Sequence, residues 1–146
     1  MKKLFLFLGL ILSVFVSKAS GPDDILGTWT NGNGKAHIVI YKEGNKYFGK
    51  ISWLAQPNNA DGTPKTDKKN PDPTRHGKPL VGAVVLRNFV YKDGEWSDGR
   101  IYDPQNGKDY KSYMTMKDNG RTLNVRGYIG LSFIGRTEVW VRKGNT

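Results

Sequence analysis

The stretch Asn70–Gly82, NPDPTRHGKPLVG, brings together residue types that could do chemistry. It holds the carboxylic acid Asp72, the imidazole His76 and the cations Arg75 and Lys78. An acid near an imidazole could move a proton, and the two cations could hold a carboxylate or phosphate group. His76 lies in a loop segment, where binding residues concentrate. We expect His76 to play a positional role and Arg75 and Lys78 to anchor the polar end of a ligand.

A catalytic interpretation of this stretch has little support from residue spacing. Ser52 or Ser112 could be combined with His76 and Asp72 into a Ser-His-Asp set. However, no nucleophile elbow of the Gly-x-Ser-x-Gly type occurs, and no spacing pairs a base with a nucleophile. We predict a protein that is not an enzyme. A hydrolase or isomerase built around His76 and Asp72 is the alternative.

The same region offers oxygen donors for a metal ion. Asp61, Asp67, Asn70 and Asp72 have the composition of a calcium loop, but the spacing is not that of an EF-hand. Lysines stand among these donors, and Asx residues beside Pro and Gly commonly form turns. With two histidines and no cysteine in the chain, a zinc site is less favoured still. We therefore predict neither a metal site nor a cofactor.

The first nineteen residues resemble a secretory leader. Lys2 and Lys3 precede the apolar run Leu4–Val16, and the small residues of Ser17-Lys18-Ala19 suit a signal peptidase. We predict a signal peptide over residues 1–19 and a single domain over residues 20–146, with a retained membrane anchor as the alternative. Since the chain has no cysteine, we expect no lipid attachment and no disulfide. The prediction is an exported protein, periplasmic or extracellular, that is not a lipoprotein and has no transmembrane segment after cleavage.

The charge of the chain bears on its partners. Removal of Lys2, Lys3 and Lys18 with the leader leaves 20 basic and 13 acidic residues, a net charge of +7. Such a charge would suit an anionic lipid or glycan surface. The alternative, which we favour, is a basic domain whose lysines simply lie in turns. The lysines are scattered along the chain rather than gathered into one face, so we predict no nucleic-acid partner.

Short β-branched and aromatic runs alternate with turn signals along the remaining chain, which indicates an all-β protein. Asp93-Gly94, Asn106-Gly107 and Asn119-Gly120 favour tight hairpins. The expected strands are Ile25–Asn31, Ala36–Glu43, Lys46–Leu54, Val84–Lys92, Glu95–Tyr102, Lys108–Lys117, Arg121–Ile129 and Ile134–Arg142. Eight such strands leave no free edge if they close into a single antiparallel up-and-down barrel. An open sheet or two-sheet sandwich is the alternative.

One long connection, Ala55–Ala83, interrupts the series of hairpins after the third strand. Its five prolines exclude a central strand, and loops of this length are commonly functional. We expect a lid or rim across one mouth of the barrel. Near the last hairpin, Gly127, Gly130 and Gly135 either open that mouth, where Arg126 would meet a ligand, or simply bend the strands.

Aromatic residues recur on nearly every strand, so the interior is either filled or holds one small ligand. We expect the remaining space to be lined by Tyr41, Phe89, Tyr102, Tyr113 and Met114. Tyr113 and Met114 are neighbours in one strand and point to opposite faces, so only one of them can face inward.

Several motifs together resemble a known family. Gly27-Thr28-Trp29 is similar to the Gly-x-Trp of lipocalin-type barrels, in which the indole packs at the closed end under a basic residue of the last strand. Arg142 matches that basic residue. With Gly49–Leu54, Asn70–Gly82, Asp98–Tyr110 and Leu123–Arg142, the chain resembles exported bacterial proteins known as a domain of unknown function. The resemblance implies a lipocalin-like barrel, and such barrels usually bind small apolar molecules.

These observations lead to two functional hypotheses. In the first, the protein binds a small apolar or amphipathic molecule such as a lipid or fatty acid, with Tyr41, Arg75, His76, Lys78, Phe89, Tyr102, Tyr113 and Arg126 as candidate ligand contacts and Gly27, Trp29 and Arg142 as structure. In the second, the barrel is filled, and an envelope interaction protein acts through its basic surface and long loop. An interior lined almost entirely by aromatic residues would favour the second hypothesis.

Overall fold

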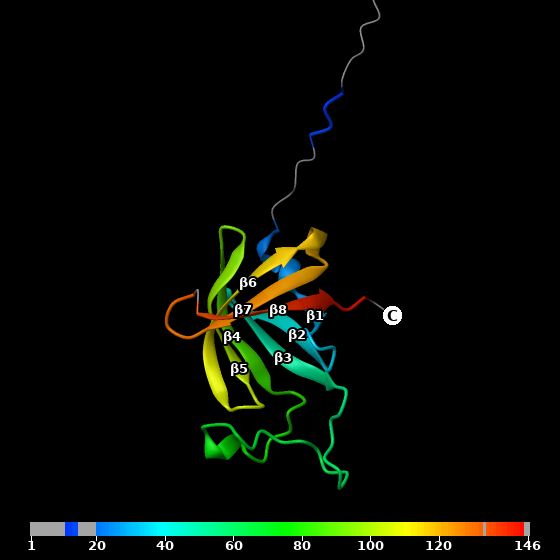
Figure 1. Ribbon diagram of the computed structural model, residues 1–146, viewed down its shortest axis with the longest axis vertical. Helices are drawn as coiled ribbons and strands as arrows, with labels where there is room; N and C mark the ends of the chain where they lie inside the picture. Colours follow the sequence, from blue (N-terminus) through cyan, green and yellow to red (C-terminus); the bar gives the residue numbers. More distant parts are fainter. Residues whose placement is uncertain (1–10, 15–19, 133, 145–146) are drawn as a thin grey trace, which may run out of the picture.

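Eight antiparallel strands close into one barrel, in which each strand pairs with its neighbour in sequence and β8 returns to β1 (Figure 1). The computed structural model describes residues 11–14, 20–132 and 134–144. The predicted barrel is therefore confirmed, and the open sheet and the sandwich are excluded. The strands are β1 (Gly27–Thr30), β2 (Ala36–Glu43), β3 (Lys46–Leu54), β4 (Val84–Lys92), β5 (Glu95–Asp103), β6 (Lys108–Lys117), β7 (Thr122–Tyr128) and β8 (Gly135–Arg142).

Three short 3-10 helices complete the secondary structure. They are η1 (Pro22–Ile25), η2 (Pro73–Arg75) and η3 (Asp118–Gly120). Within the described residues, no helix is long and apolar enough to cross a membrane. Most of the signal peptide expected over residues 1–19 lies outside the described residues.

Helix η1 closes one end of the barrel. Its Ile25 is fully buried, and the carbonyl of Ile25 accepts a hydrogen bond of 2.9 Å from Nε1 of Trp29. Nε1 of Trp96 donates to the carbonyl of Pro22 at 3.0 Å, and the hydroxyl of Tyr47 donates to Asp23 at 2.6 Å. Buried indole and phenol donors nearly always need a partner, and η1 supplies three acceptors. These three hydrogen bonds hold η1 across the end of the barrel.

Arg142 completes this closed end. Its guanidinium carbon lies 4.2 Å from the centre of the Trp29 ring, at cation–π distance. The same guanidinium donates to the carbonyls of Gly120 and Leu26, at 2.8 and 2.9 Å, and to that of Asp24. Gly27 has φ +122°, and a Cβ there would lie 3.2 Å from Arg142 Nη1. The last strand is thereby connected to the first strand, to η1 and to η3.

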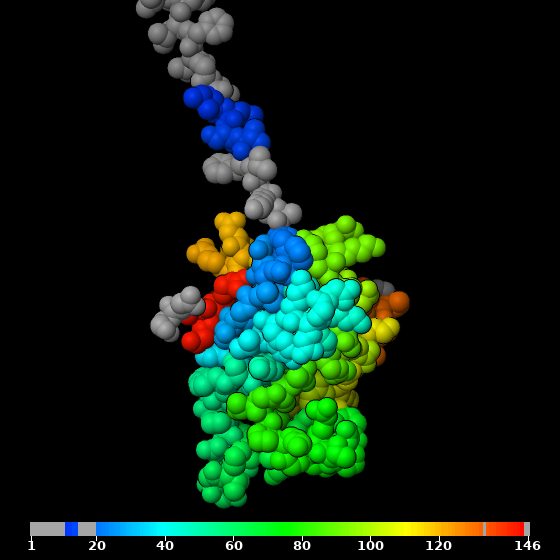
Figure 2. Space-filling view, turned by 180° about the vertical axis from the view of Figure 1, so that it is seen from behind, coloured from blue at the N-terminus to red at the C-terminus, as the bar shows by residue number. Residues whose placement is uncertain are grey.

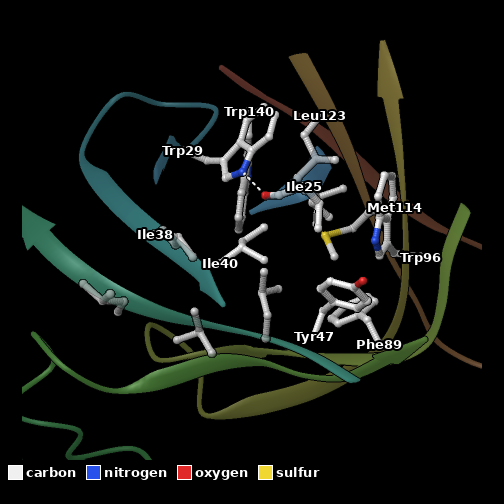
Figure 3. Close-up of a cluster of buried hydrophobic side chains, with 14 of the residues drawn as sticks. Ile25, Trp29, Ile38, Ile40, Tyr47, Phe89, Trp96, Met114, Leu123 and Trp140 are labelled. Carbon is white, nitrogen blue, oxygen red and sulfur yellow. Dashed lines mark hydrogen bonds between the residues drawn. The ribbon is translucent and has the colours of Figure 1, made fainter. Parts of the chain in front are cut away.

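Large apolar side chains pack together inside the barrel, with Ile25 of η1 among them (Figure 3). Gly49 and Gly99 make room for them: a Cβ at Gly99 would lie 2.3 Å from the Phe89 ring, and one at Gly49 would lie 2.8 Å from Leu86. The least exposed interior side chains are Ile25, Trp29, Leu86, Phe89, Trp96, Met114 and Leu123.

Candidate functional site

The long connection between β3 and β4 is an ordered structure with its own hydrogen bonds. Its outgoing and returning arms pair at Thr66 and Pro79, and the amide of Asp67 donates to the carbonyl of Lys78 at 3.0 Å. The amide of Leu80 donates to the carbonyl of Lys65 at 2.9 Å. Figure 1 shows this connection, in green, beyond the ends of β3, β4 and β5, at the end of the barrel opposite η1. This connection, which we call the rim, is therefore an ordered segment at the open end of the barrel.

A buried carboxylate fixes this rim to the barrel. Asp67 is only 4% exposed, and its Oδ1 accepts a hydrogen bond of 2.6 Å from the hydroxyl of Tyr102 in β5. Its Oδ2 accepts a bond of 2.7 Å from the side-chain amide of Asn70. Burial, together with the bond to Asp67, raises the pKa of Tyr102 well above that of a free phenol. Tyr102 therefore remains a protonated donor at any physiological pH.

A second contact joins the rim to the turn between β5 and β6. The ammonium of Lys69 donates to the carbonyl of Gln105 at 2.6 Å. A Cβ added at Gly107, which has φ +72°, would lie 2.0 Å from the carbonyl oxygen of Lys69. Only glycine suits this position, both because of the left-handed backbone and because of the close approach.

The segment from Asn70 to His76 folds back on itself through short-range bonds. Asp72 Oδ1 accepts from the amide and the hydroxyl of Thr74, at 3.0 and 2.7 Å, and so caps η2. The hydrogen bond from the Thr74 hydroxyl is the main cause of a lowered pKa at Asp72. Nε2 of His76 lies 2.7 Å from the carbonyl oxygen of Asn70. The side chain of His76 thus contacts the backbone of its own loop, as a positioning group would.

A cleft of about 430 Å³ lies between this folded segment and the start of β4. Its volume falls in the lower part of the range of small-molecule sites. The cleft is lined by charged and polar groups and by small apolar side chains, and we call these apolar side chains its apolar wall. The lining residues are Asp67, Asp72, Thr74, Arg75, Lys78, Pro79, Val81, Gly82, Ala83 and Val84.

The two cations of the cleft are not equally available to a ligand. Nε of Arg75 lies 3.8 Å from Oδ2 of Asp72, which already balances part of its charge. The Lys78 ammonium has no ion-pair partner within residues 20–132 and 134–144. Lys78 is thus the cation of the cleft best placed to pair with an anionic group, with Arg75 beside it.

The structure corrects the expected lining of the barrel interior. Tyr41 faces outward: it stands opposite Phe48 in β3, with ring centres 5.8 Å apart, and Lys50 lies over its ring. Tyr113 also faces outward and contacts Tyr128, whereas its neighbour Met114 is fully buried inside. Tyr41 and Tyr113 are therefore not lining residues of an interior site.

Three further candidates, Phe89, Tyr102 and Arg126, do not line the cleft. Phe89 is inside the barrel, but it is completely buried and packs against Gly99. Tyr102 lies on the opposite face of β5 from the inward Ile101, and the rim buries it from outside. Arg126 donates to the carbonyl of Ser132 and to the hydroxyl of Thr137, at 3.0 and 3.1 Å. Of the eight candidate contacts, only Arg75 and Lys78 line the cleft.

The hydroxyl groups considered for catalysis do not form hydrogen bonds with His76. The hydroxyl of Ser52 donates to the carbonyl of His37, and Ser112 lies inside the barrel, 1% exposed. The Ser112 hydroxyl has no hydrogen-bond partner among the described residues. Within the same residues, no group of three His, Asp or Glu side chains could hold a metal ion.

Sequence reasoning missed two features of this site. Asp67 was considered only as an oxygen donor for a metal, although its actual partners are Tyr102 and Asn70. The apolar wall that Val81 and Val84 form was not recognised. The one available signal was the run Pro79–Val84, in which apolar residues directly follow Lys78.

Comparison with known proteins agrees with this architecture. The model of a family described as "Uncharacterized protein conserved in bacteria (DUF2147)" matches residues 27–142. Among solved structures, the chain is similar to one described as protein HP1028 from the human pathogen Helicobacter pylori, which belongs to the lipocalin family. The TM-score is 0.71 at 20% sequence identity, over 83% of this chain and 84% of the other. No curated protein matches the chain.

Proposed function

We propose that this chain, which belongs to the bacterial family DUF2147 and folds as a lipocalin-like barrel, binds a small, partly apolar molecule that carries an anionic group. The observation that carries this proposal is the 430 Å³ cleft, whose lining includes both Lys78 and Arg75 and the apolar side chains of Pro79, Val81 and Val84. An amphipathic acid, such as a fatty acid or a lipid fragment, has the matching chemistry.

The cleft is favoured over the barrel interior because of the packing at the closed end. Trp29, Trp96 and Phe89 are all 0% exposed, and Gly99 is already covered by the Phe89 ring. A ligand entering that half would have to displace close-packed side chains, at a cost of several kcal/mol. The rim cleft needs no such rearrangement. Binding at the rim therefore disturbs less packing than binding in the closed half of the barrel would.

Binding at the cleft would combine apolar burial with one ionic contact. The ligand's apolar part would cover Pro79, Val81 and Val84, and each Å² removed from water contributes about 25 cal/mol. Val81 is 42% exposed in the free protein, so surface remains there to be covered. The acidic head would meet the Lys78 ammonium. No proton transfer or bond cleavage is part of this mechanism, and we propose a binding protein rather than an enzyme.

Export belongs to the same proposal. The leader-like residues 1–19 support a signal peptide, and the absence of cysteine from the chain supports release without a lipid anchor. A periplasmic or extracellular binding protein would meet amphipathic acids that are shed from envelopes.

Calorimetric titration with octanoate tests the proposal. We expect saturable binding by the wild type and about tenfold weaker binding by Lys78→Gln, since a charge-assisted contact would be lost. The matched control is Lys46→Gln, which removes an exposed lysine at the far end of the barrel and should bind as the wild type does. Octanol tests the need for the acidic head. Equal binding by Lys78→Gln and the wild type would reject the cleft as the site.

The filled closed end also favours a second function, that of an interaction protein acting through its surface. This alternative would replace the first if octanoate failed to bind and native mass spectrometry of the protein, purified gently from its host, showed no small-molecule adduct. A reproducible adduct that organic solvent removes would support the ligand-binding function.

A further inference from the structure

The connection between β7 and β8 exposes an unusual number of large apolar side chains. Ile129, Leu131 and Ile134 are 65%, 61% and 58% exposed. The backbone beneath them is closed, because the amide of Ile134 donates to the carbonyl of Leu131 at 2.9 Å. Figures 1 and 2 both show this connection, in orange, projecting from the side of the barrel. We call the residues Ile129, Leu131 and Ile134 the apolar tip. Single exposed apolar residues are ordinary, but three on one projecting turn mark an interaction site.

Basic and aromatic residues stand directly behind the apolar tip. Arg126 holds the turn through its bonds to Ser132 and Thr137. The side chain of Arg136 is 82% exposed, and its partner Glu138 is the first acid met after Asp118 along the chain. Tyr128, the last residue of β7, pairs with Gly135 directly beside the turn, and its ring centre lies 6.0 Å from that of Tyr113 in β6. Along the hairpin, the apolar tip is therefore followed first by Tyr128 and then by Arg136 and Arg126.

We propose that the apolar tip inserts into the surface of an anionic lipid bilayer. The three aliphatic side chains would enter the boundary between headgroups and acyl chains, where burial of apolar area stabilises binding. Arg126 and Arg136 would lie at the level of the phosphates, and each basic residue there favours an anionic surface. Tyr128, between the tip and these arginines, and Tyr113, which pairs with Arg126, match the preference of such rings for the membrane–water interface.

The charge pattern favours a bilayer over a protein partner. From residue 119 to residue 137 the chain has three arginines and no acid, and without residues 1–19 the chain carries a net charge of +7. A non-specific positive field of this kind suits a continuous anionic surface better than a patterned protein face. The apolar tip is also narrow, since one two-stranded turn offers three side chains, whereas stable protein interfaces bury about 800 Å² on each partner.

A site-specific fluorescent reporter tests the insertion directly. The chain has no cysteine, so Leu131→Cys can be labelled at a single position with an environment-sensitive nitrobenzoxadiazole dye. The control is Ala60→Cys, an exposed residue of the β3–β4 connection. The full chain is expressed in its host, and the first residue of the purified protein is determined by intact mass. With vesicles of phosphatidylcholine and 30% phosphatidylglycerol, we expect a blue shift and increased emission at position 131 and none at position 60.

Vesicle co-sedimentation measures the strength of the interaction. Leu131→Asp should reduce the partition coefficient at least tenfold, because a charge would have to enter the interface. Val141→Asp is the matched control, since Val141 is 52% exposed on β8 near the opposite end of the strand, and it should partition as the wild type does. Arg136→Gln should weaken binding about fivefold, and pure phosphatidylcholine should bind far less.

Three results would overturn the proposal: an unchanged spectrum at position 131, equal partitioning of Leu131→Asp and the wild type, or equal binding to neutral and anionic vesicles. The first two would leave a protein partner as the remaining occupant of the apolar tip. The test is independent of the proposed ligand site, because Lys78→Gln removes a residue of the cleft and should leave vesicle binding within twofold of the wild type.

Discussion

The two ends of this barrel are built from different kinds of contact. At the end closed by η1, indole and phenol donors bond to η1, and Arg142 reaches three carbonyls while it lies over Trp29. At the opposite end, an ordered connection is held by Asp67 and Lys69, and it leaves a cleft with cations and exposed apolar surface. The closed end is thus held by buried donors and close packing, and the open end carries the groups that can meet another molecule.

This contrast shows how a small barrel can be stable and still bind ligands. A domain of this size has a net stability of only several kcal/mol, so its close-packed half cannot easily be hollowed out. Moving the recognition groups to the rim keeps the core intact. Substitutions at the closed end should therefore lower the free energy of unfolding, and substitutions at the rim should mainly lower the affinity for a ligand.

The largest effect is expected for Arg142→Ala. The substitution removes the cation over Trp29 and leaves the carbonyls of Gly120 and Leu26 without their donor. We expect the free energy of unfolding to fall by about 3 kcal/mol, measured by urea denaturation. Arg136→Ala, at an 82% exposed side chain, should change it by less than about 0.5 kcal/mol. Similar values for the two variants would contradict a structural role for Arg142.

Gly99→Ala should cost about 2 kcal/mol, because the new Cβ would collide with the Phe89 ring and overpack the core. Adding Phe89→Leu to this variant should recover part of that loss. Gly77→Ala is the control: its added Cβ meets nothing within 4 Å, and its φ is not positive. A stable Gly99→Ala protein would show that the interior has spare room.

Tyr102→Phe should lower the free energy of unfolding by about 1 kcal/mol, since it removes one of the two side-chain donors to the buried Asp67. Its larger consequence should be local. Faster hydrogen exchange at the amide of Asp67 and weaker octanoate binding are both expected, because Asp67 lines the cleft. Tyr113→Phe, on the outer surface, serves as the control. Unchanged exchange would show that other contacts hold the rim.

The smallest effect concerns acid stability. Burial raises the pKa of Asp109, but hydrogen bonds from Arg87 and Arg100 outweigh it, so the pKa lies below its ordinary value of 3.8. A lowered carboxyl pKa stabilises the fold above pH 3.8, and this stabilisation is lost as the pH falls through the folded value. Asp109→Asn should remove a contribution of about 0.5 kcal/mol from the pH profile. The control is Glu43→Gln, because Glu43 has no ion pair among the described residues. This variant should lose stability at acid pH as the wild type does.

The strand order could be predicted from sequence because it depends on local signals. Turns such as Asp93-Gly94 and Asn119-Gly120 fix where strands end, and their positive φ values are present in the structure. The inward or outward direction of the side chains was harder to predict than the strand order. Asn88 and Asp98 have φ +61° and +56° within strands, so the alternation shifts where it was expected to continue.

The cleft was even less accessible to sequence reasoning. Arg75 and Lys78 were expected as anchors because of their residue types, but the fold of their loop depends on Tyr102, which is distant in sequence. Tyr102 is buried only because the rim covers the outer face of β5, and no periodicity in β5 encodes that burial. Long-range packing of this kind is set by tertiary structure.

The most direct test of the central claim is a two-dimensional NMR titration of the isotope-labelled protein with octanoate. We predict saturable shifts of the amides of Arg75, Lys78, Val81 and Val84, which line the cleft or its apolar wall. The amides of Ser112 and Val125, inside the barrel, should remain unchanged. Shifts confined to these interior amides would place the ligand in the barrel, and the absence of any shift would contradict ligand binding at the rim.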